Sequence, residues 1–93
     1  MAILSFRCKD TRSLFEEGHS RRFVNIGSVA MRKLAMLNRA GVLDDLRIPP
    51  NNHLEALRDN RTGQHGIRVN RQWRICFVWT DNGPRDVEIV DFH

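Results

Sequence analysis

Two short segments near the C-terminal end of the chain carry the side chains with the most evident chemistry. Arg74 interrupts the apolar run of residues 73–79, WRICFVW, and the last three residues are Asp91, Phe92 and His93. A histidine or a carboxylate can transfer a proton to or from a reacting oxygen, and an arginine can stabilise negative charge that develops in a transition state. An aromatic ring can stack on an unpaired base. Together these groups suit metal-free cleavage of RNA by its own 2′-OH.

A predicted hairpin brings these two segments together. Residues 73–80 and 85–92 have the pattern of strands, and the Asn82-Gly83 pair between them is a strong hairpin signal. An antiparallel hairpin about this turn pairs residues 91–93 with residues 73–75, to within about two residues. The arginine, the carboxylate, the ring and the histidine are therefore expected at one end of the sheet.

Each of these side chains also has a purely structural interpretation. Arg74 could form a surface ion pair with Asp91, which would contribute little. Phe92 could belong to the core, and a terminal histidine such as His93 is commonly exposed. The residue types alone leave both interpretations open.

Other catalytic patterns are missing from the sequence. No serine stands in a GxSxG elbow, and no glycine-rich phosphate loop follows a strand and opens a helix. A helix-turn-helix in residues 26–46 would have a second helix too short and acidic for the major groove. The histidines and cysteines lack metal-ligand spacing, so no metal or cofactor is expected and both cysteines should be free thiols. These residues are His19, His53, His65, His93, Cys8 and Cys76.

Arginine dominates the basic residues of this chain. The formal net charge is +4, and 13 of the 15 basic residues are arginines. Arginine binds phosphate with two donors and stacks on bases, which lysine does not. Five arginines fall within 17 residues of sequence: Arg58, Arg61, Arg68, Arg71 and Arg74. This cluster favours an anionic partner, although a solvated basic face would have the same composition.

The elements that must position these residues are predicted from hydrophobic periodicity. The length of 93 residues suits one domain over residues 1–93. Helices are expected over residues 11–17 and 26–40, with one more turn over residues 42–46. Strands are expected over residues 2–7, 54–57, 65–70, 73–80 and 85–92. Helices followed by an antiparallel meander predict a compact α+β domain, with the helices packed on one face of a twisted sheet.

Capping and polarity signals add detail to the helices. Asp10 is expected to cap the first helix, while Gly18 and Gly41 are expected to end the two helices. Lys33 is assigned to the polar face of the second helix. No apolar run approaches the roughly 18 residues needed to cross a bilayer, and the N-terminus lacks the architecture of a signal peptide. A cytoplasmic protein is therefore expected.

The sequence resembles the HigB branch of the RelE/ParE toxin superfamily, the toxins of type II toxin–antitoxin modules. The resemblance begins at SLFEEG (residues 13–18), is strongest in LEALRDNRTGQHGIRVNRQWRICFVW (54–79) and ends with VEIVDFH (87–93). It implies a RelE-like fold and an endoribonuclease that cuts mRNA in the ribosomal A site. It also implies a helix-turn-helix antitoxin as partner. The toxin would associate with DNA only indirectly, through this antitoxin.

The resemblance also implies roles for individual residues. The catalytic residues it implies are Arg58, Arg74, Asp91 and His93. The RNA-binding residues expected beside them are Arg61, Arg68, Arg71 and Phe92. Relatives can have tyrosine where this chain has Phe92 and histidine where it has Glu55, so His93 should carry more of the proton transfer. A slow enzyme is therefore one hypothesis, with Glu55 as a substitute base or a solvated surface residue.

Two other functions remain open at the level of sequence. A catalytically silent protein could block translation through basic contacts to ribosomal RNA. A gyrase poison of the ParE type would fit the superfamily but has no need of a cluster of Arg74, Asp91 and His93. Cleavage of mRNA is the function that uses all three residues.

Overall fold

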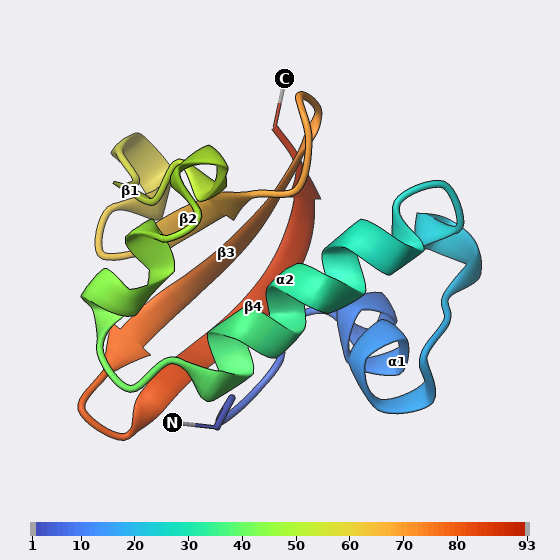
Figure 1. Ribbon diagram of the computed structural model, residues 1–93, viewed down its shortest axis with the longest axis horizontal. Helices are drawn as coiled ribbons and strands as arrows, with labels where there is room; N and C mark the ends of the chain where they lie inside the picture. The colour runs from blue at the N-terminus through green and yellow to red at the C-terminus, as the bar shows by residue number, and fades with distance from the viewer. Residues whose placement is uncertain (1, 93) are drawn as a thin grey trace.

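The computed structural model describes residues 2–92 and contains a four-stranded antiparallel sheet in the order β1-β2-β3-β4. Helix α2 lies across one face of this sheet, and helix α1 lies beside α2 (Figure 1). The strands are β1 Glu55–Ala56, β2 His65–Arg68, β3 Trp73–Thr80 and β4 Gly83–Asp91, and the helices are α1 Lys9–Glu17 and α2 Gly27–Arg39. Short 3₁₀ turns span Arg21–Phe23, Leu43–Arg47, Pro50–Asn52 and Asp59–Arg61. The predicted α+β class and antiparallel sheet are confirmed.

The core lies between α2 and one face of the sheet. Alternate side chains of β2, β3 and β4 are buried against the apolar side of α2, as a pleated strand requires. These residues are Ile67, Ile75, Phe77, Val87 and Ile89 on the sheet and Ala30, Leu34 and Leu37 on the helix. Trp73 joins them edge-on to Phe23, with ring centroids 5.6 Å apart. The opposite face of the sheet is therefore left for Arg74 and its neighbours.

The helix boundaries correct two expectations. The residue before α1 is Cys8, and Asp10 lies inside the first turn, so Asp10 is not the cap. Gly18 does end α1, with the positive φ of 85° that glycine tolerates. Gly41 does not end α2, because the chain already becomes extended at Ala40. Within residues 2–92, none of the helices is long and apolar enough to cross a membrane.

The N-terminal strand expected over residues 2–7 is reduced to a single parallel bridge between Phe6 and Val87. Hydrogen bonds on either side, such as Val87 N–H to the Ser5 carbonyl, hold the segment beside β4. Asp86 has a φ of 54° and forms a bulge where the β3–β4 register shifts, which bends the strand and disrupts regular pairing. The strand expected over residues 54–57 likewise shortens to Glu55–Ala56.

Lys33 was assigned to the polar face of its helix, and this assignment is wrong. The side chain is buried, and its Nζ donates to Oδ1 of Asn52 and, at 3.5 Å, to Oδ1 of Asn51. Burial lowers the pKa of Lys33, and the nearby positive charge of Arg32 lowers it further. The Asn52 amide in turn donates to the Leu46 carbonyl at 3.0 Å. Lys33 and Asn52 therefore tie α2 to the segment that precedes β1.

We expect Asn52→Ala to lower the free energy of unfolding by about 3 kcal/mol, because it strands a buried ammonium without its main acceptor. For a chain of this size the melting temperature should fall by more than about 10 °C, measured by circular dichroism. Asn51→Ala is the matched control, since Asn51 is exposed and lies farther from Lys33. Equal melting temperatures for the two variants would show that Asn52 does not hold the ammonium in place.

Candidate functional site

Arg74 lies on β3, between β2 and β4, and on the sheet face turned away from the core. Its Nε and Nη1 are buried and have no hydrogen-bond partner within residues 2–92. Its Cζ is 5.3 Å from the centroid of the Phe92 ring, close enough for a cation–π contact. Arg74 as a whole is half-buried, and guanidinium donors without partners are costly, so the group is suited to bind an anion.

A second arginine lies directly across from Arg74. In the β2–β3 register Arg68 is the partner of Arg74, and Val90 of β4 flanks Arg74 on the other side. Direct cross-strand partners share one face of a sheet, and like charges in that position are destabilising. Arg68 Nε donates to the Asn70 carbonyl at 3.2 Å, which leaves its other donors for a ligand. Two guanidinium groups on neighbouring strands could bind the oxygens of one phosphate.

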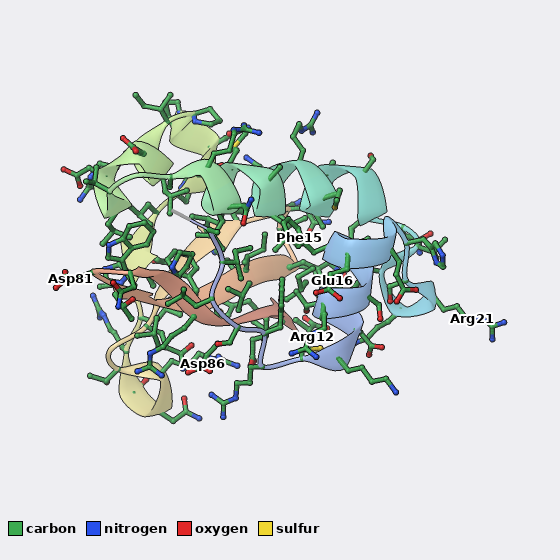
Figure 2. All side chains as sticks on the ribbon, turned by 90° about the horizontal axis from the view of Figure 1, so that it is seen from below. Arg12, Phe15, Glu16, Arg21, Asp81 and Asp86 are labelled. Carbon is green, nitrogen blue, oxygen red and sulfur yellow. The ribbon has the colours of Figure 1, made fainter. Side chains whose placement is uncertain are left out.

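A pocket of about 390 Å³ lies next to Arg74, because Phe92, which contacts the Arg74 guanidinium, is one of its lining residues. The segment that forms its wall lies across the sheet from α2 (Figure 2). The lining residues are Glu55, Ala56, Leu57, Arg58, Asp59 and Phe92. Two of the residues expected at the site, Arg58 and Phe92, therefore line one cavity, and Phe92 also contacts Arg74. The lining thus combines a ring, the Arg58 cation and two acidic residues, Glu55 and Asp59.

The end of β4 is fixed by the turn between β2 and β3. Asn70 Oδ1 accepts hydrogen bonds from the backbone N–H groups of Gln72 and Trp73, each at 2.8 Å. The Gln72 carbonyl accepts the Phe92 N–H at 2.6 Å, and Gln72 Nε2 donates to Asp91 Oδ2 at 3.0 Å. Through Gln72, the turn therefore holds both the backbone of Phe92 and the carboxylate of Asp91 in place. The sequence carries no signal for Gln72, because its role depends on this long-range contact.

The hairpin register agrees with the sequence prediction, since Trp73 is the partner of Asp91. Asp91 and Phe92 therefore lie at the same end of the sheet as Arg74. Arg71 is exposed in the turn before β3. The predicted catalytic residue His93 lies outside the described residues. Of the four predicted catalytic residues, the structure thus brings Arg58, Arg74 and Asp91 to one region.

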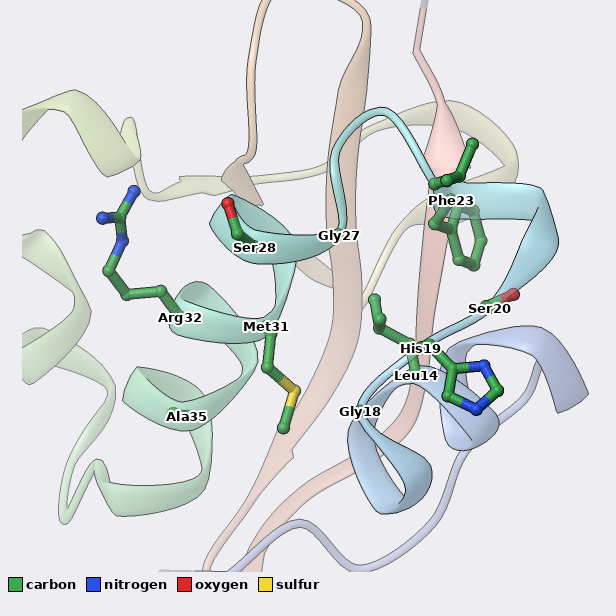
Figure 3. Close-up of a pocket in the computed structure, with 11 residues that line it drawn as sticks. Leu14, Gly18, His19, Ser20, Phe23, Gly27, Ser28, Met31, Arg32 and Ala35 are labelled. Carbon is green, nitrogen blue, oxygen red and sulfur yellow. The ribbon is translucent and has the colours of Figure 1, made fainter.

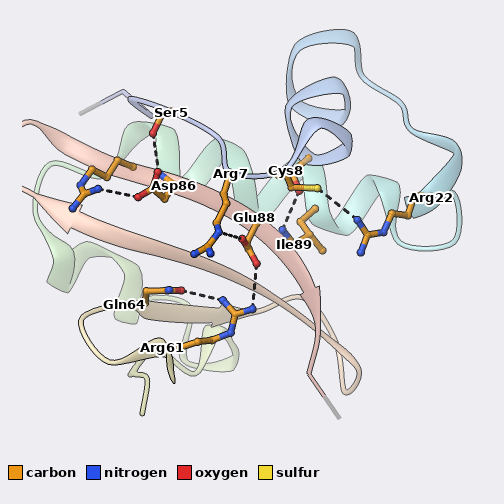
Figure 4. Close-up of polar contacts among 11 residues, drawn as sticks. Ser5, Arg7, Cys8, Arg22, Arg61, Gln64, Asp86, Glu88 and Ile89 are labelled. Atoms are coloured by element: carbon orange, nitrogen blue, oxygen red, sulfur yellow. Dashed lines mark hydrogen bonds and ion pairs between the residues drawn. The ribbon is translucent and has the colours of Figure 1, made fainter. Parts of the chain in front are cut away.

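Arg61, which was expected to bind RNA, is held against the sheet by Glu88 and Gln64 (Figure 4). Its Nη2 is 3.2 Å from Glu88 Oε1, and its Nη1 donates to Gln64 at 3.1 Å. Arg7 reaches the other carboxylate oxygen of Glu88 at 3.4 Å. Because Arg61 follows Arg58 by three residues, this ion pair anchors the segment that carries Arg58. In the sequence, Glu88 stands out only because it is an acidic residue between two core positions of a strand.

We expect Arg61 and Glu88 to be energetically coupled. Their side chains are only 27% and 14% exposed, so a double-mutant cycle with alanine should give a coupling energy of about 1 kcal/mol or more. Arg47 and Asp44 form a shorter contact of 3.0 Å but are 66% and 77% exposed. That control pair should give less than about 0.5 kcal/mol. Urea denaturation of the variants measures both coupling energies. Equal values for the two pairs would show that the Arg61–Glu88 ion pair does not anchor the segment.

Cys76 lies within this charged region but is chemically inert. Burial raises the pKa of its thiol to about 11, although Arg61 and Arg74 oppose that rise. The negative charges of Glu88 and Glu55 raise the pKa further. The thiol remains protonated at neutral pH and is neither a nucleophile nor a base. Cys8 and Cys76 are both free, as predicted.

The chain is similar to known toxins over most of its length. Residues 4–93 match the family of HigB-like toxins, described as the RelE-like toxin of type II toxin-antitoxin system HigB. Toxin HigB-1 of Vibrio cholerae serotype O1 is 39% identical over 80 residues, which is 84% of each chain. An uncharacterized protein of Haemophilus influenzae is 37% identical over 68 residues, or 73% of this chain and 67% of its own. The family match includes every residue of the candidate site.

Proposed function

The chain belongs to the HigB-like toxin family of type II toxin–antitoxin systems, and from that premise we propose that it is a ribosome-dependent endoribonuclease. In this proposal it acts in the cytoplasm, cuts mRNA on the ribosome and thereby inhibits translation until its antitoxin binds it. The observation that carries the proposal is the Arg74 guanidinium, whose buried donors have no partner within residues 2–92 and which faces Phe92. A cation on a rigid strand is well placed to stabilise a phosphate in its transition state.

The proposed reaction uses only the RNA and the side chains of the site. The 2′-oxygen attacks the adjacent phosphorus and loses its proton to a base, while the bond from phosphorus to the 5′-oxygen breaks. An acid protonates the leaving 5′-oxygen, so the products are a 2′,3′-cyclic phosphate and a 5′-hydroxyl. Arg74 and Arg58 stabilise the negative charge on the phosphorane oxygens. This route assigns the proton transfers to His93 and Asp91.

Phe92 and Glu55 set this chain apart within the proposed mechanism. Phe92 can stack on a base, but it has no hydroxyl and cannot transfer a proton. Glu55 lines the same pocket as Phe92 and is exposed, so it is the alternative base. Because the Phe92 ring can only stack, proton transfer depends on the residues near it. This favours the hypothesis that the enzyme is slow.

Three further arginines have binding or positioning roles in this proposal. Arg68 and Arg71 contact backbone phosphates beside the scissile bond, and Arg61 acts through Glu88 by holding the segment that carries Arg58. Contacts of this kind release counterions, so affinity for RNA should fall steeply as salt rises.

Primer extension on mRNA with purified ribosomes tests the proposal directly. The wild-type protein should create new 5′ ends only when ribosomes are present, and those ends should carry a 5′-hydroxyl. Arrested translation with intact mRNA would identify the protein as a non-catalytic ribosome-binding inhibitor, the alternative that the missing tyrosine hydroxyl favours. Gyrase–DNA adducts without mRNA ends would instead indicate a gyrase poison.

A further inference from the structure

A larger pocket, of about 570 Å³, lies between the end of α1 and the solvent side of α2. Figure 3 shows its walls, which come from α2 and from the connection between the two helices. Its lining residues are Leu14, Gly18, His19, Ser20, Phe23, Val24, Gly27, Ser28, Met31, Arg32 and Ala35. We call this pocket the helix groove. None of the residues of the pocket lined by Arg58 and Phe92 lines it.

The helix groove is apolar inside. Leu14 and Phe23 are each 1% exposed and form its floor, while Val24 at the rim is 76% exposed. Met31 and Ala35 of α2 lie one helical turn apart on the same face. A largely exposed valine next to an open apolar pocket is a surface that gains from being covered.

Within residues 2–92, the lining of the helix groove carries a positive charge and no acidic residue. Arg32 lines it and forms no ion pair with any residue between positions 2 and 92. Arg21 extends from the connection between the helices into solvent (Figure 2). Arg22 pairs with Asp10 at 3.5 Å, but both side chains are 49% exposed. The acids of α1, Glu16 and Glu17, are outside the lining.

We propose that the helix groove is the docking site for an acidic amphipathic helix of the antitoxin. Apolar side chains of such a helix would enter between Leu14, Phe23 and Met31, as in other complexes that bind a helix in a groove. An acidic side chain on its flank would face Arg32, which favours this partner over a basic or neutral one. The inference rests on the toxin–antitoxin assignment and not on the proposed RNA cleavage.

Isothermal titration calorimetry with the antitoxin encoded beside this toxin tests the proposal. Met31→Glu places an acid inside the groove and should weaken binding by about 100-fold, the scale of a central hot spot. Arg32→Glu should weaken it by about tenfold and reduce its salt dependence. Val42→Glu is the matched control, because Val42 is also apolar and 57% exposed but lies outside the groove. That control should bind like the wild type.

Several results would overturn this assignment. One is wild-type affinity in both groove variants, provided that their circular dichroism spectra and melting temperatures show a folded protein. Another is that Arg58→Glu, in the pocket that Arg58 and Phe92 line, abolishes binding while the groove variants bind normally, which would place the antitoxin over that pocket. A third is a wild-type dimer that Met31→Glu converts to a monomer without changing antitoxin affinity. Because the readout is affinity, loss of the RNA-cleavage proposal would leave this test intact.

Discussion

Arg74→Ala should lower the rate of cleavage of ribosome-bound mRNA by about 10²–10³-fold, the loss expected for one charge-stabilising donor. The side chain projects from the sheet face opposite the core, and its Nε and Nη1 have no partner within residues 2–92. Its removal therefore breaks no ion pair in the described chain, and the melting temperature should change by only a few degrees. Single-turnover cleavage kinetics and thermal melting together measure the two effects.

Two further variants sharpen this experiment. Arg74→Lys keeps the charge but loses the planar fork that binds two phosphate oxygens, so its rate should lie between those of the wild type and Arg74→Ala. Arg47→Ala removes an arginine that is 66% exposed and does not line the pocket, and its rate should match the wild type. If Arg74→Ala unfolds the protein, or cleaves at the wild-type rate, Arg74 is a structural residue.

The position of Arg74 could be predicted because every signal for it is local. The period of two in residues 73–80 separates Arg74 from Ile75, and Asn82-Gly83 marks the hairpin. With the turn located, the pairing of Trp73 with Asp91 follows by counting residues. The bulge at Asp86 shifts the register by one residue, which was within the uncertainty of that count.

The features that could not be predicted depend on partners distant in sequence. The partner of Lys33 is Asn52, and that of Arg61 is Glu88, 27 residues away. A charged residue on a helix is normally solvated, so its burial becomes evident only when the partner's position is known. The helix groove has the same origin, because the GHSRRFV connection carries no signal that a pocket will form beneath it.

The second large effect concerns proton transfer. His93→Ala should lower the cleavage rate by about 10²–10⁴-fold, the range for loss of a positioned acid or base, while binding to ribosomes persists. The loss should be large here because position 92 holds a ring without a hydroxyl. Single-turnover cleavage and ribosome sedimentation measure the two properties separately.

Restoring a hydroxyl at position 92 provides the decisive control. If the missing hydroxyl concentrates proton transfer on His93, then Phe92→Tyr should raise the rate of the wild type and recover part of the rate of His93→Ala. Phe92→Ala should instead lower the rate, because it removes the ring that lies over Arg74 and lines the pocket. A Phe92→Tyr variant no faster than the wild type would mean that another group, with Glu55 the first to test by Glu55→Gln, already moves the proton. In that case, having phenylalanine rather than tyrosine at position 92 would not slow catalysis, and the ring would be the part of the side chain that matters.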